Sequence, residues 1–157
     1  RVSKLHLDEL IEVKFTDTKK DIFLVTKYGM CIRFHETDVR VTGRVSMGVI
    51  GMKLDGGDEV VGMQMASQGE YMLVASENGY GKMTHIDEFK CQNRGGKGIM
   101  GQTTREEDFV EHLFVTSTHS HIMFFTNTGR VHRKKGYLIP EAGRTARGTC
   151  IASLYAM

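Results

Sequence analysis

The sequence has no apolar run long enough to cross a membrane, only one proline and no tryptophan among its 157 residues. A membrane-spanning helix needs roughly 20 apolar residues in succession, and residues 1–7 lack the apolar core of a signal peptide. We therefore expect a soluble, cytoplasmic protein with no membrane partner. With 40% hydrophobic and 25% charged residues, which are ordinary values for folded proteins, the chain is predicted to fold throughout as a single domain.

The cysteines are too few and too scattered for a disulfide framework or a zinc site. Cys31, Cys91 and Cys150 are odd in number and form no Cys-x-x-Cys pair, so we expect them to be reduced and buried. Four histidines also lack a cysteine or carboxylate that would complete a ligand set at plausible spacing; they are His112, His119, His121 and His132. No metal and no cofactor is predicted.

The patterns of an enzyme site are missing as well. The chain has no Gly-x-Ser-x-Gly segment and no cysteine with a partnered histidine, and we predict no catalytic site in it. The net charge is +2, from 21 basic and 19 acidic residues. This total is too small to indicate a nucleic-acid partner. Whether the chain binds nucleic acid must instead be judged from where the charges lie along the sequence.

The chain repeats itself every 50 residues. Gly29, Gly79 and Gly129 share that spacing and the same local context. An apolar run ending in a hydroxyl residue precedes each glycine, a short polar turn leads into it, and a more polar extended segment follows, a pattern typical of a β-hairpin. The first strands are predicted at residues 22–26, 72–76 and 122–126, and the second strands at 30–34, 80–84 and 130–134.

Other landmarks keep the same spacing. Arginines recur at Arg44, Arg94 and Arg144, and glycines at 48, 98 and 148. We expect further strands at 10–15, 60–65, 110–115, 49–54 and 149–154, with short helical turns only near 36–39 and 86–89. About four strands per 50-residue unit predict an all-β, propeller-like fold. The three blades are placed at roughly 9–58, 59–108 and 109–157, with 1–8 completing a neighbouring blade.

Charge follows the repeat. Acidic clusters at 55–59 and 105–108 occupy equivalent positions between blades, whereas basic residues fall in the loop that follows each hairpin and in the last hairpin. Equivalent positions of a circular repeat lie on one rim, so a polyanion could follow that rim and displace counterions. The alternative interpretation is that these loops are solvated turns, as charge runs usually are.

One basic loop has a distinctive sequence, Gln92-Asn93-Arg94-Gly95-Gly96-Lys97-Gly98. It resembles the gyrase A box, a Gln-basic-basic-Gly-Gly-basic-Gly segment found in the C-terminal domain of the A subunit of DNA gyrase. Glycines let backbone N–H groups approach a phosphate, and the flanking cations neutralise it. A nucleotide-binding loop would need Ser or Thr after the lysine and then a helix, so an ATP site is disfavoured.

Residues 57–62, 106–114, 124–130 and 139–148 resemble the same family. The resemblance implies a β-pinwheel, a propeller-like ring with altered strand connections, whose basic rim bends DNA. In that family the nucleophilic tyrosine of the topoisomerase lies in a separate domain, which nothing in this chain matches. The resemblance therefore implies the non-catalytic part of a gyrase-like enzyme, which supports DNA supercoiling in the bacterial cytoplasm in association with the nucleoid.

The chain departs from the family in three ways. Asn93 stands where the box usually has Lys or Arg, so one phosphate contact is missing. The family has about six blades and this chain three, and the blade order is permuted or shortened, with the join near residues 98–104. Because three wedges fill a circle poorly, our hypothesis is that two chains pair into a six-bladed assembly.

Double-stranded DNA, bound through its phosphates, is the predicted partner, with other gyrase-like subunits as further partners. A protein-interaction propeller without DNA wrapping remains the alternative, and salt separates the two because phosphate contacts weaken as salt rises. The predicted DNA-binding residues are Gln92, Asn93, Arg94, Gly95, Gly96, Lys97 and Gly98, extended by Arg44, Arg133, Lys134, Lys135, Arg144 and Arg147.

Overall fold

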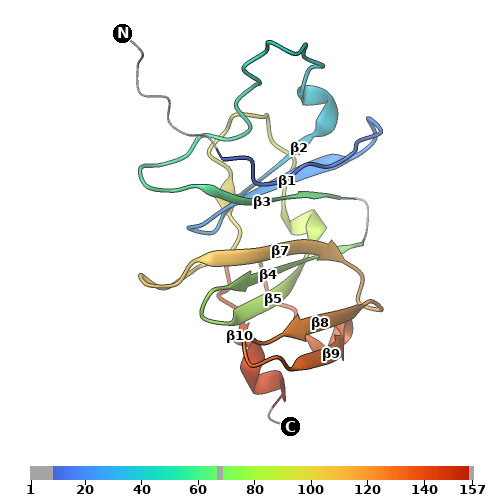
Figure 1. Cartoon of the computed structure of the whole chain (residues 1–157), viewed down its shortest axis with the longest axis vertical. Coiled ribbons are helices and arrows are strands. Elements are labelled where there is room, and N and C mark those ends of the chain that lie inside the picture. Colours follow the sequence, from blue (N-terminus) through green and yellow to red (C-terminus); the bar gives the residue numbers. More distant parts are fainter. Residues whose placement is uncertain (1–8, 67–68, 156–157) are drawn as a thin grey trace.

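The computed structural model describes residues 9–66 and 69–155. The strand predicted at residues 1–8 lies outside these residues. These residues form three antiparallel sheets, which are stacked along the long axis of the molecule (Figure 1). The first sheet has the order β3 (Val60–Met65), β1 (Asp21–Thr26), β2 (Met30–His35) and β6 (Ile99–Met100).

The second sheet has the same plan, one repeat further along the chain. Its order is β10 (Thr149–Cys150), β5 (Tyr80–His85), β4 (Tyr71–Ser76) and β7 (Val110–Thr116). In the described residues the third sheet has two strands, β8 (His121–Phe125) and β9 (Val131–Lys135). Short 3-10 turns complete the fold: η1 (Glu36–Asp38), η2 (Ile86–Glu88), η3 (Gly136–Leu138) and η4 (Ile151–Tyr155). The all-β prediction is confirmed.

Each hairpin turn is built by two recurring residues. The glycine closing the turn has a positive φ in all three hairpins, +82° at Gly29, +79° at Gly79 and +78° at Gly129, which glycine adopts without steric cost. The hydroxyl residue ending the first strand accepts a hydrogen bond from the N–H four residues later, at 3.1 Å from Met30 to Thr26. Ser76 and Thr126 make the equivalent bonds, which explains the recurrence of a hydroxyl there.

Each four-stranded sheet takes its two outer strands from the repeat that follows. On one edge β3 pairs with β1 and β7 pairs with β4, with Ile22 opposite Met65 and Met72 opposite Val115, and both pairings shift register before the hydroxyl residue. On the other edge the two-residue strands β6 and β10 pair with β2 and β5. Successive repeats are therefore interlocked.

Two of the predicted strands are absent from the structure, so these two predictions are wrong. Residues 10–15 and 49–54 contain no strand, and of 149–154 only Thr149–Cys150 is one, followed by η4. The reason is positional, because segments at these places in the repeat pair with the hairpin of the preceding repeat. For 10–15 and 49–54, no preceding hairpin lies among the described residues.

The core lies between the sheets. Phe23 and Val25 of β1 pack against Met72 and Val74 of β4, while alternate residues of β4 face the third sheet and Ile122. Both faces of the middle sheet are therefore apolar, as expected for a sheet sandwiched between two others. Among the described residues, no helix is long and apolar enough to span a membrane.

The cysteine prediction holds only in part. Cys31 is buried in the core and burial raises the pKa of its thiol to about 12. Cys150 is half-buried, and Cys91 is exposed. Cys91 follows a 3-10 turn and begins a surface loop, where the apolar strand pattern used for the prediction does not extend.

Candidate nucleic-acid interface

The glycine-rich basic loop sits on the edge of the first sheet. Cys91 forms a parallel bridge with Arg33 of β2, and the N–H of Gln92 donates to the Arg33 carbonyl at 2.7 Å. Ile99, just after the loop, pairs with Cys31 of the same strand. The loop is thus held at both ends, and residues 93–98 between these anchors are presented at the surface.

Two of the backbone donors in this loop are already used. The N–H of Gly95 donates to the Gly51 carbonyl at 2.8 Å, and that of Gly96 donates to the Asn93 carbonyl at 3.4 Å. The Gly95 and Gly96 donors of the backbone cradle expected from the sequence are therefore bonded to the chain's own carbonyls. We expect phosphate contacts from the loop to come from its side chains as well.

Arg94 and Arg144 each donate a hydrogen bond to a backbone carbonyl of the preceding repeat. Arg94 donates through Nε to the Asp38 carbonyl at 3.0 Å and through Nη1 to the Ile50 carbonyl. Arg144 donates through Nη1 to the carbonyl of Met100, the position equivalent to Ile50. Both arginines therefore help to hold their loops in place, besides carrying positive charge. A guanidinium has five N–H donors, so donors remain for a phosphate.

Lys97 is the most exposed cation of the loop, with 59% of its side chain accessible and Nζ 2.9 Å from Asp55 Oδ1. Asp55 is exposed by 70%. Such surface ion pairs contribute roughly 0–1 kcal/mol. A phosphate can therefore compete with Asp55 for Lys97.

The basic loops lie in series. Arg94 and Lys97 contact residues 50–55, the stretch that follows the loop of Arg44. In the next repeat Arg144 contacts Met100, and the Thr103 hydroxyl donates to the Thr145 carbonyl at 2.7 Å. These repeated contacts join the loops of residues 40–48, 90–98 and 140–148 into one row, which we call the basic row.

Arg147 is held differently from Lys97, its equivalent. Its guanidinium stacks on the Tyr80 ring, 3.4 Å from the centroid. A stacked guanidinium is fixed in orientation and keeps its charge. Arg147 therefore adds a rigid cation to the third loop of the basic row.

Arg133, Lys134 and Lys135 belong to a separate element, strand β9. The register places Lys135 opposite His121 and Arg133 opposite Met123. The pKa of His121 is lowered, first by desolvation and then by the charges of Lys135 and Arg133. This face of the hairpin is electropositive.

Lys82 is a residue that the sequence reasoning missed. Its side chain is fully buried, and its Nζ donates to the Gly143 carbonyl at 2.6 Å and to the Arg144 carbonyl. Lys82 thereby ties the third loop of the basic row to β5. The available signal was a lysine inside a predicted strand, at the position where the first repeat has Ile32.

Burial of Lys82 makes folding stability depend on alkaline pH. Desolvation is the main cause that lowers its pKa from 10.5 to about 8. Between these values the unfolded chain binds more protons than the folded chain, so stability rises with pH across this window. We expect Lys82→Met to remove that rise, on the order of 2 kcal/mol. Urea denaturation of both proteins from pH 7.5 to 10.5 measures the difference; parallel stability curves would contradict the assignment.

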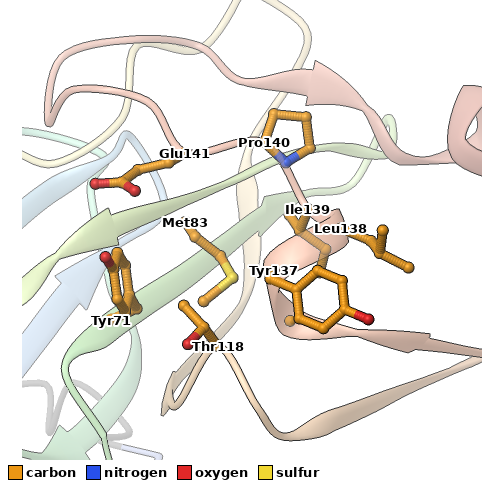
Figure 2. Close-up of a pocket in the computed structure, with 9 residues that line it drawn as sticks. Tyr71, Met83, Thr118, Tyr137, Leu138, Ile139, Pro140 and Glu141 are labelled. Carbon is orange, nitrogen blue, oxygen red and sulfur yellow. The ribbon is translucent and has the colours of Figure 1, made fainter.

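A small cavity of about 230 Å³ lies between the second sheet and η3. Figure 2 shows the Tyr71 hydroxyl pointing toward the Glu141 carboxylate at its rim. The Glu141 charge is the main cause that raises the pKa of Tyr71, which is the opposite of what activates a tyrosine nucleophile. Within the described ranges, no group of three or more His, Cys, Asp or Glu residues is placed to hold a metal ion.

Comparison with protein families finds a match over most of the chain. The family described as DNA gyrase C-terminal domain, beta-propeller, matches residues 20–67, 70–117 and 120–156. The A subunit of DNA gyrase from Streptococcus pneumoniae is 36% identical over 156 residues, which are 98% of this chain and 16% of the relative. The corresponding gyrase protein of Staphylococcus aureus is 39% identical over 150 residues, 94% of this chain and 17% of the relative. The chain thus spans about a sixth of these relatives.

Solved structures share the fold. The C-terminal domain of DNA topoisomerase IV matches with a TM-score of 0.80 and 25% identity, over 89% of this chain and 44% of that one. The DNA gyrase A C-terminal domain matches with a TM-score of 0.71 and 23% identity, over 85% and 43%. The predicted propeller-like β-pinwheel is confirmed.

Proposed function

This chain belongs to the family of DNA gyrase C-terminal domains, and from that premise we propose that it binds duplex DNA through phosphates and bends it. The observation that carries the proposal is the basic row. Arg44, Lys97 and Arg147 come from three loops that repeated contacts join in series. Cations spaced along an edge contact successive phosphates and read no base, because loops of this kind insert nothing into a groove.

The wider role follows from the same premise. We propose that the chain is a non-catalytic part of a gyrase-like type II topoisomerase, in which it supports DNA supercoiling beside other gyrase-like subunits at the bacterial nucleoid. Bending a duplex costs energy that the contacts along a curved edge must offset. We also propose that two copies of the chain complete one ring, which would lengthen that edge.

Salt-dependent binding tests the DNA proposal. We expect a fluorescent random-sequence duplex to bind with an affinity that falls steeply as salt rises. In Arg94→Ala/Lys97→Ala the affinity should drop and the slope of log affinity against log salt should become shallower by about 2, since each lost phosphate contact removes ~0.9. Fluorescence anisotropy at four or more salt concentrations measures both quantities.

Two further variants make the result specific. Lys97→Ala alone removes an exposed cation that makes no bond to the backbone, so it tests binding without disturbing the Arg94 contacts. Lys19→Ala removes an exposed lysine outside the basic row and should bind as the unchanged chain does. Binding that does not weaken with salt, or equal losses in Lys97→Ala and Lys19→Ala, would favour the protein-interaction propeller instead.

A further inference from the structure

The cavity beside η3 lies at the junction of the second and third repeats, and its counterpart at the previous junction is filled by an arginine. Met83 of β5 lines the cavity and forms a parallel bridge with Glu141. Exactly one repeat earlier, Arg33 of β2 forms a parallel bridge with Cys91. The carbonyl of each strand residue then accepts a hydrogen bond from the residue after its bridge partner, at 2.9 and 2.7 Å. Met83 therefore holds the position of Arg33.

The first junction shows what this position can bind. Arg33 Nε lies 2.7 Å from Asp21 Oδ2, and its Nη1 donates to the carbonyls of Ile86 and Phe89 at 3.0 and 3.1 Å. The guanidinium carbon also lies 5.5 Å from the centroid of the Phe23 ring. The junction thus surrounds the guanidinium with a carboxylate, two carbonyls and an aromatic ring, which are the partners that this planar cation prefers.

The second junction keeps these carbonyls but has no cation beside them. Gly136 and Ile139 are the equivalents of Ile86 and Phe89, and both line the cavity. The two turns share one hydrogen bond, from the later N–H to the earlier carbonyl, at 2.9 Å in η3 and 3.1 Å in η2. Among the described residues that line the cavity there is no lysine, arginine or histidine. The place of the Arg33 guanidinium is therefore a space here.

The second junction also keeps a carboxylate, although it comes from a different position. Tyr71 replaces Asp21 and Glu141 replaces Cys91, so the acid moves from the strand to the loop. Figure 2 shows the Tyr71 hydroxyl and the Glu141 carboxylate together at the rim of the cavity. The Glu141 charge is the main cause that raises the pKa of Tyr71, and the charge of Glu70 adds to it. The rim is therefore electronegative.

Two tyrosine rings line the same cavity. Figure 2 shows Tyr71 on one side of Met83 and Tyr137 on the other. Guanidinium groups stack on aromatic faces, as Arg147 does on the Tyr80 ring. The cavity volume of about 230 Å³ is several times the roughly 30 Å³ that one water molecule occupies. A guanidinium and the first carbons of its chain therefore have room to enter.

We propose that this cavity binds a guanidinium group from another molecule, held by the Glu141 carboxylate and the carbonyls of Gly136 and Ile139. The bound group takes the place that the Arg33 guanidinium has at the first junction. It belongs either to an arginine side chain of another polypeptide or to a free guanidinium compound, and the recognition is the same for both. Glu141 lies at the start of the third loop of the basic row, so a docked arginine would attach its carrier beside that row.

Titration with ethylguanidinium tests the site directly. In protein with isotope-labelled methionine methyl groups, the Met83 NMR signal should shift and saturate with a dissociation constant on the order of 1–10 mM, far below the molar range in which guanidinium denatures proteins. Met83→Leu identifies the signal by removing it. Met52, which is buried in the first sheet, is the internal reference and should not shift. N-ethylurea has the same planar shape without the charge, and it should leave the Met83 signal unmoved.

A change of the carboxylate tests its part in binding. Glu141→Gln keeps the shape of the side chain and removes its charge, so the dissociation constant for ethylguanidinium should rise at least about tenfold. Glu141 is exposed, and the fold should tolerate the change. Glu107→Gln removes another exposed carboxylate, one that does not line the cavity, and should bind ethylguanidinium as the unchanged chain does. Equal losses in the two variants would mean attraction to acidic surface in general and would overturn the proposal.

A further variant supplies the cation from within the chain. The side chain of Met83→Arg should occupy the cavity as Arg33 does at the first junction, so the saturation-transfer NMR signal of ethylguanidinium should disappear. A folded variant that still binds ethylguanidinium would contradict the site. Because Met83 is buried, circular dichroism first checks the fold, and Glu141→Gln tests the same site without a change in the core.

Two ligands distinguish the sources of the guanidinium. A capped Gly-Arg-Gly tripeptide presents the group on a peptide, and the same tripeptide with citrulline is its uncharged control. A shift of the Met83 signal with both the arginine tripeptide and ethylguanidinium would support an arginine side chain of a polypeptide. A shift with ethylguanidinium alone would restrict the site to free guanidinium compounds. The proposal is overturned if neither ligand shifts the signal, or if N-ethylurea shifts it equally.

The DNA and guanidinium proposals can fail separately. Arg94→Ala/Lys97→Ala should lose DNA affinity and bind ethylguanidinium unchanged, because neither residue lines the cavity. Glu141→Gln should lose ethylguanidinium and keep salt-sensitive DNA binding, since it removes no cation. A chain that binds ethylguanidinium but no DNA would reject only the DNA proposal, and the converse would reject only the cavity.

Discussion

Gly98→Ala is expected to lower the free energy of unfolding by about 3 kcal/mol, although the residue lies in a surface loop. Its φ is +78°, and a non-glycine residue in this conformation costs roughly 1–3 kcal/mol. The new Cβ would also lie 2.5 Å from the Cys31 carbonyl oxygen, and relieving that clash costs about 1–3 kcal/mol more. Urea denaturation followed by circular dichroism measures the loss.

Gly48→Ala is the matched control for Gly98→Ala. Gly48 has the same φ of +78° but open space around its Cβ position. The control should lose only the conformational part, about 1 kcal/mol. Equal losses at the two glycines would show that the close approach to β2 contributes nothing.

Arg33→Ala is expected to destabilise the chain by a similar amount, about 3 kcal/mol. Its Nε lies 2.7 Å from Asp21 Oδ2, and its Nη1 donates to the carbonyls of Ile86 and Phe89 at 3.0 and 3.1 Å. Both partners of the ion pair are 18% exposed. Removing the guanidinium leaves a half-buried carboxylate and two carbonyls without their donor, and it separates the first sheet from η2. Thermal and urea unfolding both report the loss.

Two substitutions test this interpretation of Arg33. Arg33→Lys keeps the charge but lacks the planar fork of donors, so it should recover only part of the stability. Lys20→Ala removes a cation that is 31% exposed and whose partner Asp17 is 52% exposed, and it should cost less than about 1 kcal/mol. A loss at Arg33 no larger than at Lys20 would mean that the contacts to η2 do not stabilise the fold.

The hairpins were predictable because their signals are local. A strand ending in a hydroxyl, a polar turn and a glycine with positive φ lie within about ten residues, as at Thr26 and Gly29. The edge strands were harder, since pairing depends on a hairpin about 40 residues away or more. Val60–Met65 pairs with β1, whereas residues 10–15, which have the same sequence pattern, form no strand.

The candidate site was likewise predictable from the sequence only in part. The sequence located the glycine-rich loop, and the contacts of Gln92 and Ile99 hold that loop at the surface. The assignment of DNA contacts to its residues stays a prediction. What the sequence could not provide was the second use of Arg94 and the buried donor Lys82, because both depend on carbonyls from other repeats. Amino-acid type reveals a cation, but only the fold shows what it already binds.

The borrowing of outer strands sets the order in which the chain can fold during synthesis. The first sheet needs Met100, and the second needs Cys150, so neither can be finished when its own hairpin leaves the ribosome. Translation at about 5–20 residues per second leaves the hairpin β1–β2 waiting several seconds for its last strand. During that wait its edges are open to strands of other nascent chains. Neighbouring ribosomes on one messenger RNA would thus offer the earliest opportunity for mispairing, and the rate of elongation should affect the yield of folded protein.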